Sequence, residues 1–187
     1  DLITTAPLEI IYSGSAELDR VRQALAAAFA TLPREEVRTI ADAVPHVCRE
    51  SVQTVEDEME VTQGKLSMGF SCGSSDMPAL LMGNTLFGGS SNSKLFLNVR
   101  EKLSLCYYAS SLYHRQKGLI TVSSGIEFQN YQRAYDEIMA QMEAVQKGEL
   151  EDWELEGARS TLLNSYATIG DSQGKLENFY LGQAATG

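Results

Sequence analysis

The chain has few of the side chains that bind zinc in proteins. Its 187 residues include two histidines and three cysteines. His46 and His114 belong to neither H-E-x-x-H nor H-x-x-E-H, the spacings that place two imidazoles on one zinc ion beside a glutamate base. We therefore expect neither a metal site nor a catalytic centre in this chain, and we expect both histidines to be exposed.

The cysteines follow no pairing pattern. Cys48, Cys72 and Cys106 are an odd number, are widely spaced, and form no C-x-x-C pair. This usage fits a reducing compartment, so we predict a cytoplasmic location. Cys72 and Cys106 are expected to be buried, inert thiols. A G-x-S-x-G elbow is also missing, so an independent hydrolase is poorly supported.

Positive charge is in short supply. Lys and Arg number 15 against 25 Asp and Glu, which gives a formal net charge of -10. Sequence-independent nucleic-acid binding needs a basic surplus, so we exclude nucleic acid and, likewise, an anionic membrane surface as partners. No run of about eighteen apolar residues is present to span a membrane. A first residue other than Met indicates an excised or processed piece, so we expect a fragment of a longer chain.

Apolar residues are plentiful, at 43% of the sequence, enough for a single domain over residues 1–187. Strict alternation over Lys65–Ser71 predicts a strand with one packed face. Tyr107–His114 and Leu119–Ile126 predict two strands joined by a glycine-containing turn, hence an antiparallel hairpin. A further short strand is expected over Leu8–Tyr12.

Apolar residues at helical spacing predict the remaining elements. The first helix is expected from Glu17, with Ser15 as its N-cap. The other helices are expected at residues 77–87, 93–102, 131–145 and 155–169, and from 172 to the chain end. Together these elements predict an α+β fold, a two-layer sandwich with helices packed on one face of an antiparallel-containing sheet.

A flexible loop, Gly88-Gly89-Ser90-Ser-Asn92, precedes one of these helices. Backbone N–H groups at a helix start favour anions, but the loop has neither the lysine of a P-loop nor the G-x-G-x-x-G spacing. A loop whose backbone groups pair with an extended peptide fits this composition better.

The segment from Leu97 to Ser110 carries the sharpest motif. Its Arg100-Glu-Lys-Leu-Ser-Leu-Cys-Tyr107 run resembles the L-R-E-K-x-x-L-x-Y segment of the peptidase family that includes pitrilysin, insulysin and mitochondrial processing peptidase. The loop that begins at Gly88 and the strand at Lys65–Ser71 also resemble the corresponding parts of that family. Cys106 stands where the family commonly has a glycine.

The resemblance implies a later, non-zinc-binding domain of such a peptidase. In the family, an arginine and a tyrosine of this domain reach the substrate backbone, and they correspond to Arg100 and Tyr107; Gly88, Gly89 and Ser90 are further candidates for substrate binding. From the residues alone, Arg100 would instead complement a helix C-terminus and Tyr107 would fill a core position. Both interpretations stay open here.

The function implied is a substrate-binding part of a zinc metallopeptidase. A separate H-x-x-E-H domain or subunit would supply the zinc, as in a heterodimer whose partner chain lacks the motif, and the ligand would be a peptide or protein substrate. The alternative is a catalytically inactive peptidase fold that acts in protein–protein interaction or subunit stabilisation. A homo-oligomer also stays open.

Overall fold

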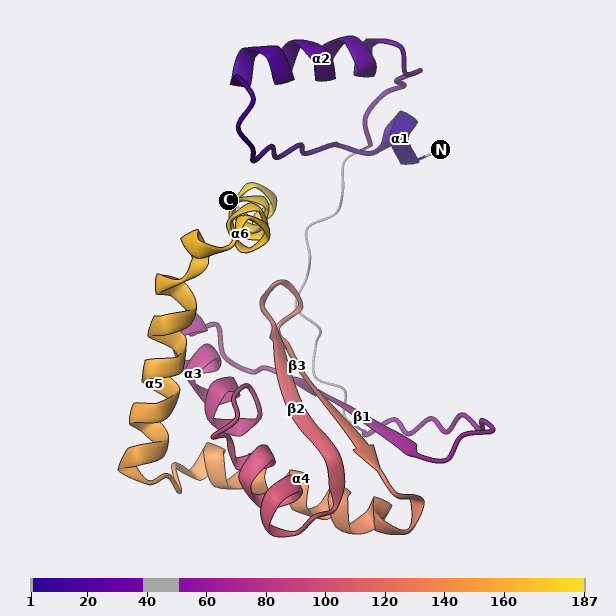
Figure 1. The fold of residues 1–187 in the computed structure, drawn as a ribbon. Coiled ribbons are helices and arrows are strands. Elements are labelled where there is room, and N and C mark those ends of the chain that lie inside the picture. Colours follow the sequence, from indigo (N-terminus) through magenta and orange to yellow (C-terminus); the bar gives the residue numbers. More distant parts are fainter. Residues whose placement is uncertain (1, 39–50, 187) are drawn as a thin grey trace. The chain divides into compact units, whose positions relative to one another are not determined.

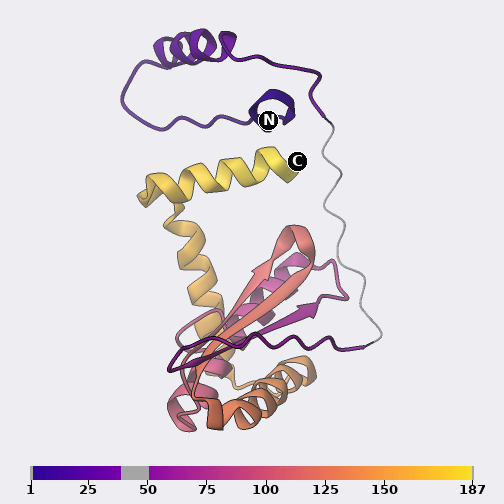
Figure 2. The same ribbon diagram turned by 90° about the vertical axis from the view of Figure 1, so that its right-hand side faces the viewer.

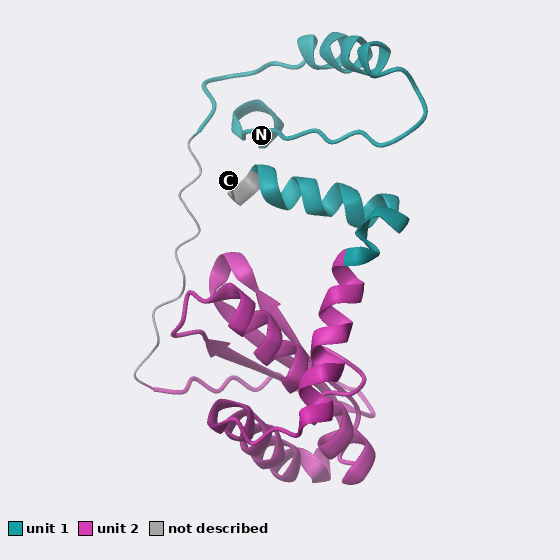
Figure 3. Ribbon diagram, turned by 90° about the vertical axis from the view of Figure 1, so that its left-hand side faces the viewer, with its two compact units in different colours: residues 1–43, 167–187 teal, residues 44–166 magenta. Residues whose placement is uncertain are grey.

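The computed structural model describes residues 2–38 and 51–186, which divide into two compact units. One unit comprises residues 44–166, and the other joins residues 1–43 to residues 167–187 (Figure 3). We describe each unit by itself. The expectation of one domain over the whole chain stays a prediction.

The larger unit is built on a three-stranded antiparallel sheet. Its strands are β1 (Gly64–Ser71), β2 (Cys106–His114) and β3 (Leu119–Ile126), in the spatial order β1-β3-β2 (Figure 1). The predicted hairpin is confirmed. Its turn, residues 115–117, ends at Gly118, whose φ of 56° lies in the left-handed region that glycine tolerates.

Helices pack on one face of this sheet (Figures 1 and 2), which confirms the predicted α+β sandwich. They are α3 (Met77–Phe87), η1 (Leu95–Lys102) and α4 (Tyr131–Lys147), and α5 (Asp152–Ala167) follows α4. Strand alternation supplies the inner face, and every second residue of β1 points into the core, as predicted. The buried core cluster is Leu66, Phe87, Leu95, Val99, Leu105, Ala109, Val122, Ile126, Ala134 and Ile138.

Local signals set the ends of these helices. The Asp76 side chain accepts a hydrogen bond from the Ala79 N–H (3.1 Å) at the start of α3. Gly148, with φ 71° in the left-handed region, ends α4. The helix expected over residues 93–102 is present, but η1 is wound as a π-helix, and the Leu103 N–H reaches back five residues to the Asn98 carbonyl oxygen (3.1 Å).

The smaller unit contains helices and corrects two predictions. Leu8–Tyr12 is not a strand, because a strand needs a hydrogen-bonded partner and no described strand pairs with it. Ser15 is not an N-cap, since the helix begins after Glu17 and no side chain caps it. Two helices were predicted correctly here, and α1 and η4 were not foreseen. The helical elements are α1 (Leu2–Thr5), α2 (Leu18–Ala30), η4 (Ile169–Asp171) and α6 (Gln173–Thr186).

Candidate functional site

Arg100 and Tyr107 lie together, where η1 ends and β2 begins. The Arg100 Nε–H donates a hydrogen bond to the Tyr107 carbonyl oxygen (2.9 Å). The guanidinium also lies over the Phe96 ring, 4.7 Å from its centroid, and its Nη1 is 3.2 Å from the Glu101 Oε1. A guanidinium carries five N–H donors. These contacts fix the position of Arg100 and leave further donors for a ligand.

A β-bulge determines where Tyr107 points. The ladder pairs Cys106 with Ile126 and Tyr108 with Gly125, so Tyr107 is the extra residue. Its side chain is 52% exposed, which contradicts the core position inferred from the residues alone. The phenol hydroxyl donates only a long hydrogen bond, 3.4 Å, to Glu127 Oε1. Tyr107 is therefore positioned at its backbone while its side chain faces solvent.

An open pocket of about 370 Å³ surrounds this pair. The turn between η1 and β2 contributes Ser104 and Leu105 to its lining, and Ser104 has a φ of 49°, in the region that non-glycine residues seldom adopt. The lining includes one guanidinium, two hydroxyl groups and two carboxylates. Such donors and acceptors are suited to hydrogen bonds with peptide backbone groups. The lining residues are Arg100, Glu101, Ser104, Leu105, Cys106, Tyr107 and Glu127.

Cys106 lines the pocket with a half-buried thiol. Burial raises the pKa of Cys106, while a hydrogen bond with Ser124 and the positive charge of Arg100 lower it in part. Because the thiolate is the reactive form, the raised pKa favours an unreactive thiol. Cys72 and Cys106 are half-buried and not fully buried as expected, and their inertness stays a prediction.

In a variant with Cys48→Ser and Cys72→Ser, we expect Cys106 to be alkylated by iodoacetamide more slowly than free cysteine near pH 7. The pH at which the alkylation rate reaches half its maximum, here called the midpoint, should lie above that of free cysteine, because burial disfavours the thiolate. Adding Arg100→Ala should raise the midpoint further, since a positive charge is removed. A midpoint below that of free cysteine would contradict this assignment.

The glycine-rich loop lies apart from the pocket. The Gly88 carbonyl oxygen accepts from the Ser111 N–H (2.9 Å), and the N–H groups of Gly88 and Gly89 both donate to the Asn84 carbonyl oxygen (3.0 and 2.8 Å). Ser111 is four residues beyond Tyr107 along β2, roughly 13 Å at strand spacing. The structure thus gives Gly88 and Gly89 internal hydrogen bonds and does not bring them to Arg100; their substrate role stays a prediction. Ser90 likewise donates to the Thr85 carbonyl oxygen (3.3 Å).

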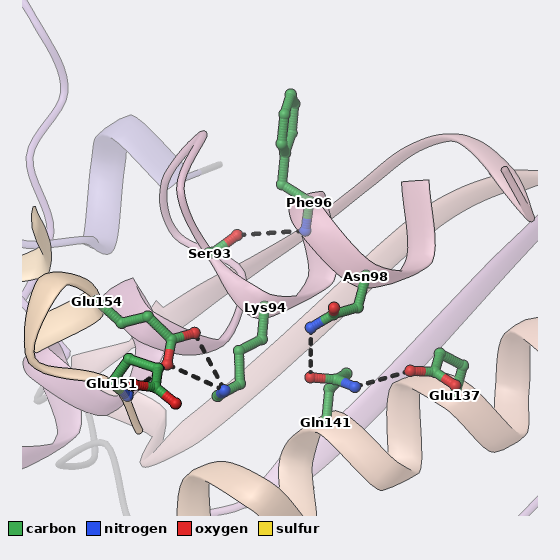
Figure 4. A network of polar contacts seen from close by, with 8 residues as sticks. All are labelled: Ser93, Lys94, Phe96, Asn98, Glu137, Gln141, Glu151 and Glu154. Atoms are coloured by element: carbon green, nitrogen blue, oxygen red, sulfur yellow. Dashed lines mark hydrogen bonds and ion pairs between the residues drawn. The ribbon is translucent and has the colours of Figure 1, made fainter. Parts of the chain in front are cut away.

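Two polar contacts that the sequence analysis did not predict hold η1, the element that carries Arg100 (Figure 4). The buried Lys94 Nζ lies 3.0 Å from Glu154 Oε1 at the start of α5. Further along η1, Asn98 Nδ2 donates to Gln141 Oε1 of α4 (2.8 Å). The partners are 60 and 43 residues apart, so no local pattern could have indicated them.

Within residues 2–38 and 51–186, no group of three or more His, Cys, Asp and Glu side chains could hold a metal ion. His114 is half-buried, with Nε2 3.0 Å from Thr121 Oγ1, so the prediction that it is exposed was wrong. His46 and Cys48 lie outside the described residues. A zinc ion therefore finds no fitting ligand set in this part of the chain. No described helix is long and apolar enough to cross a membrane.

Two comparisons with known sequences both find inactive peptidases. Residues 5–162 match the sequence profile of the peptidase M16 inactive domain. YmfF of Bacillus subtilis strain 168, which bears the name probable inactive metalloprotease, is 36% identical over 184 residues, or 95% of this chain and 42% of YmfF.

Solved structures show the same fold. A conserved protein from Enterococcus faecalis V583 is similar with a TM-score of 0.73 and 29% identity, over 90% of this chain and 40% of that one. A protease from Helicobacter pylori has the same fold, with a TM-score of 0.67 and 19% identity over 92% and 43% of the two chains. This chain spans less than half the length of these relatives.

Proposed function

The chain belongs to the peptidase M16 inactive domain family, and on this premise we propose that it holds an extended peptide through Arg100 and Tyr107 for cleavage by a separate zinc-binding domain or subunit. The observation that carries the proposal is the open pocket in which Arg100 is bonded to the Tyr107 backbone. The zinc and its H-x-x-E-H ligands would belong to that other domain or subunit, where the ion would activate water.

The chemistry of the pair suits a peptide carbonyl. Arg100 is held through its Nε, so its terminal nitrogens can donate to a carbonyl oxygen or to the oxyanion that develops during cleavage. Tyr107 can add a second donor, because its present contact with Glu127 is long and exposed. Donors held in place before the substrate binds cost little reorganisation.

The cleavage test uses the full-length parent together with the chain or domain that carries H-x-x-E-H. We expect Arg100→Ala to lower the rate of zinc-dependent peptide cleavage on the order of a hundredfold, and Tyr107→Phe to lower it as well, because each removes one donor. Zinc content should stay unchanged, since neither residue lies in a metal cluster.

Arg133→Ala is the matched control, because Arg133 is an exposed arginine on α4, outside the pocket lining. Its cleavage rate should equal that of the wild type. If Arg100→Ala cleaves as fast as this control, the peptide-holding role is wrong. If no combination of chains cleaves a peptide, the second candidate is favoured: an interaction module on a peptidase fold.

A further inference from the structure

Within the described part of the larger unit, the sheet face opposite the helices carries small side chains on β1 and β3. Residues of β1 and β3 on this face include Ser67, Gly69, Thr121 and Ser123, which are exposed or half-buried. Figure 2 shows the sheet with its helices on the other side. The large side chains that β2 places on this face, Tyr108 and Leu112, are exposed.

Tyr108 is such a side chain, and Gly125 fixes its position. A Cβ on Gly125 would lie 2.5 Å from Tyr108 Cε1 and 2.9 Å from Cδ1, so the ring rests directly on the glycine. The Tyr108 hydroxyl lies 3.4 Å from the Ser123 Oγ across the sheet. With one side on the strand and 43% of the residue exposed, the ring presents its other side to solvent.

The bulge places this ring beside the peptide-holding pair. In a regular strand, Tyr107 and Tyr108 would point to opposite faces, but the extra residue leaves both exposed. Their Cα atoms are about 3.8 Å apart. The Tyr107 hydroxyl reaches Glu127 and the Tyr108 hydroxyl reaches Ser123, which lie four residues apart in sequence, roughly 13 Å at strand spacing. An extended peptide whose backbone is held at Arg100 and Tyr107 covers that span with about four residues.

We propose that Tyr108, seated on Gly125, is a specificity-determining residue that contacts an apolar or aromatic side chain of the bound peptide. This inference rests on the proposed function. The residues that the ring contacts, Gly125 and Ser123, are uncharged, and an exposed aromatic ring attracts other aromatic and apolar groups. Lys65, paired with Gly125 from β1, adds positive charge on that face and disfavours a basic side chain.

The test measures binding of two fluorescent peptides to the full-length protein with its zinc-binding partner. The peptides are identical except for one position, which is Phe in one and Ala in the other, and this position is moved along the sequence in a small set. At one position the wild type should prefer Phe by about five- to tenfold, a typical size for an aromatic contact. Tyr108→Ala should abolish the preference, and Tyr108→Phe should retain it.

Gly125→Ala tests whether the position of the ring matters, because the added Cβ displaces the Tyr108 ring while residue 108 remains a tyrosine. It should also abolish the preference. Leu112→Ala is the control: Leu112 is an exposed apolar residue of β2 on the same face, four residues away, and its loss should change nothing.

Failure of this inference differs from failure of the proposed function. If Arg100→Ala weakens binding of both peptides while Tyr108→Ala keeps the Phe preference, only the role of Tyr108 is overturned. If neither peptide binds the wild type, or Arg100→Ala binds both as the wild type does, the proposed function fails and this inference with it.

Discussion

Lys94→Met is expected to lower the free energy of unfolding by about 3–5 kcal/mol. Lys94 and Glu154 form an ion pair at 3.0 Å, and their side chains are only 11% and 7% exposed. Removing the ammonium leaves a buried carboxylate without its counter-charge, which is the costly way to break such a pair. Urea unfolding followed by circular dichroism measures the change, and fluorescence of Trp153, the sole tryptophan, reports the neighbouring start of α5.

The second partner provides the comparison. Glu154 Oε2 also accepts the Glu151 N–H (2.8 Å) at the start of α5. Glu154→Gln keeps an acceptor there but removes the charge, so it too should destabilise the protein. The double variant Lys94→Met with Glu154→Gln leaves no unpaired buried charge and should be more stable than Lys94→Met alone. If the losses in unfolding free energy of the two single variants add up to that of the double variant, the two residues are not coupled. The ion pair would then not account for the loss of stability.

The Lys94–Glu154 ion pair also helps to position the candidate site. Lys94 precedes η1 and Asn98 lies within it, and their partners are on α5 and α4 (Figure 4). Arg100 follows Asn98 by two residues, so the contacts that hold η1 also set where the guanidinium lies. Stability and peptide binding are therefore expected to change together in Lys94→Met. In Arg100→Ala, which removes a half-buried charge, peptide binding should change more than stability.

The sequence predicted the parts of the fold that local periodicity controls. Alternation at Lys65–Ser71 predicted one strand and the turn at Gly118 predicted the hairpin, while the order β1-β3-β2 was not predicted. Leu8–Tyr12 has the same apolar character but no described strand partner, and a pattern in one segment says nothing about its partner.

The candidate site was predictable only in part. Arg100 and Tyr107 came from a motif, and the structure joins them through a backbone hydrogen bond. The exposure of Tyr107 was not predictable, because it depends on an unpaired residue in the ladder, and a bulge has no reliable signature in one strand. The seat of Tyr108 on Gly125 depends on the register of two strands, which sequence alone does not fix.

The last prediction separates a packing role from a substrate role for Gly88. A Cβ there would lie 2.7 Å from Leu95 Cδ1 and from both the backbone nitrogen and Oγ of Ser111. Ser111 cannot move freely, because its N–H bonds the Gly88 carbonyl oxygen (2.9 Å) and its hydroxyl bonds the buried Asn84 (2.8 Å). We expect Gly88→Val to lower the free energy of unfolding by about 3 kcal/mol, through overpacking and loss of buried hydrogen bonds.

Gly83→Ala is the matched control, because Gly83 lies within α3, the helix that Gly88 follows. Apart from its own helix backbone and chain neighbours, no described atom lies within 4 Å of its would-be Cβ, so the change should raise the free energy of unfolding by about 0.5–1 kcal/mol through helix propensity. Because the loop does not line the pocket, peptide affinity of folded Gly88→Ala, the milder variant, should match the wild type. A stable Gly88→Ala protein that no longer binds peptide would instead mean that the loop contacts substrate, as the motif resemblance implies.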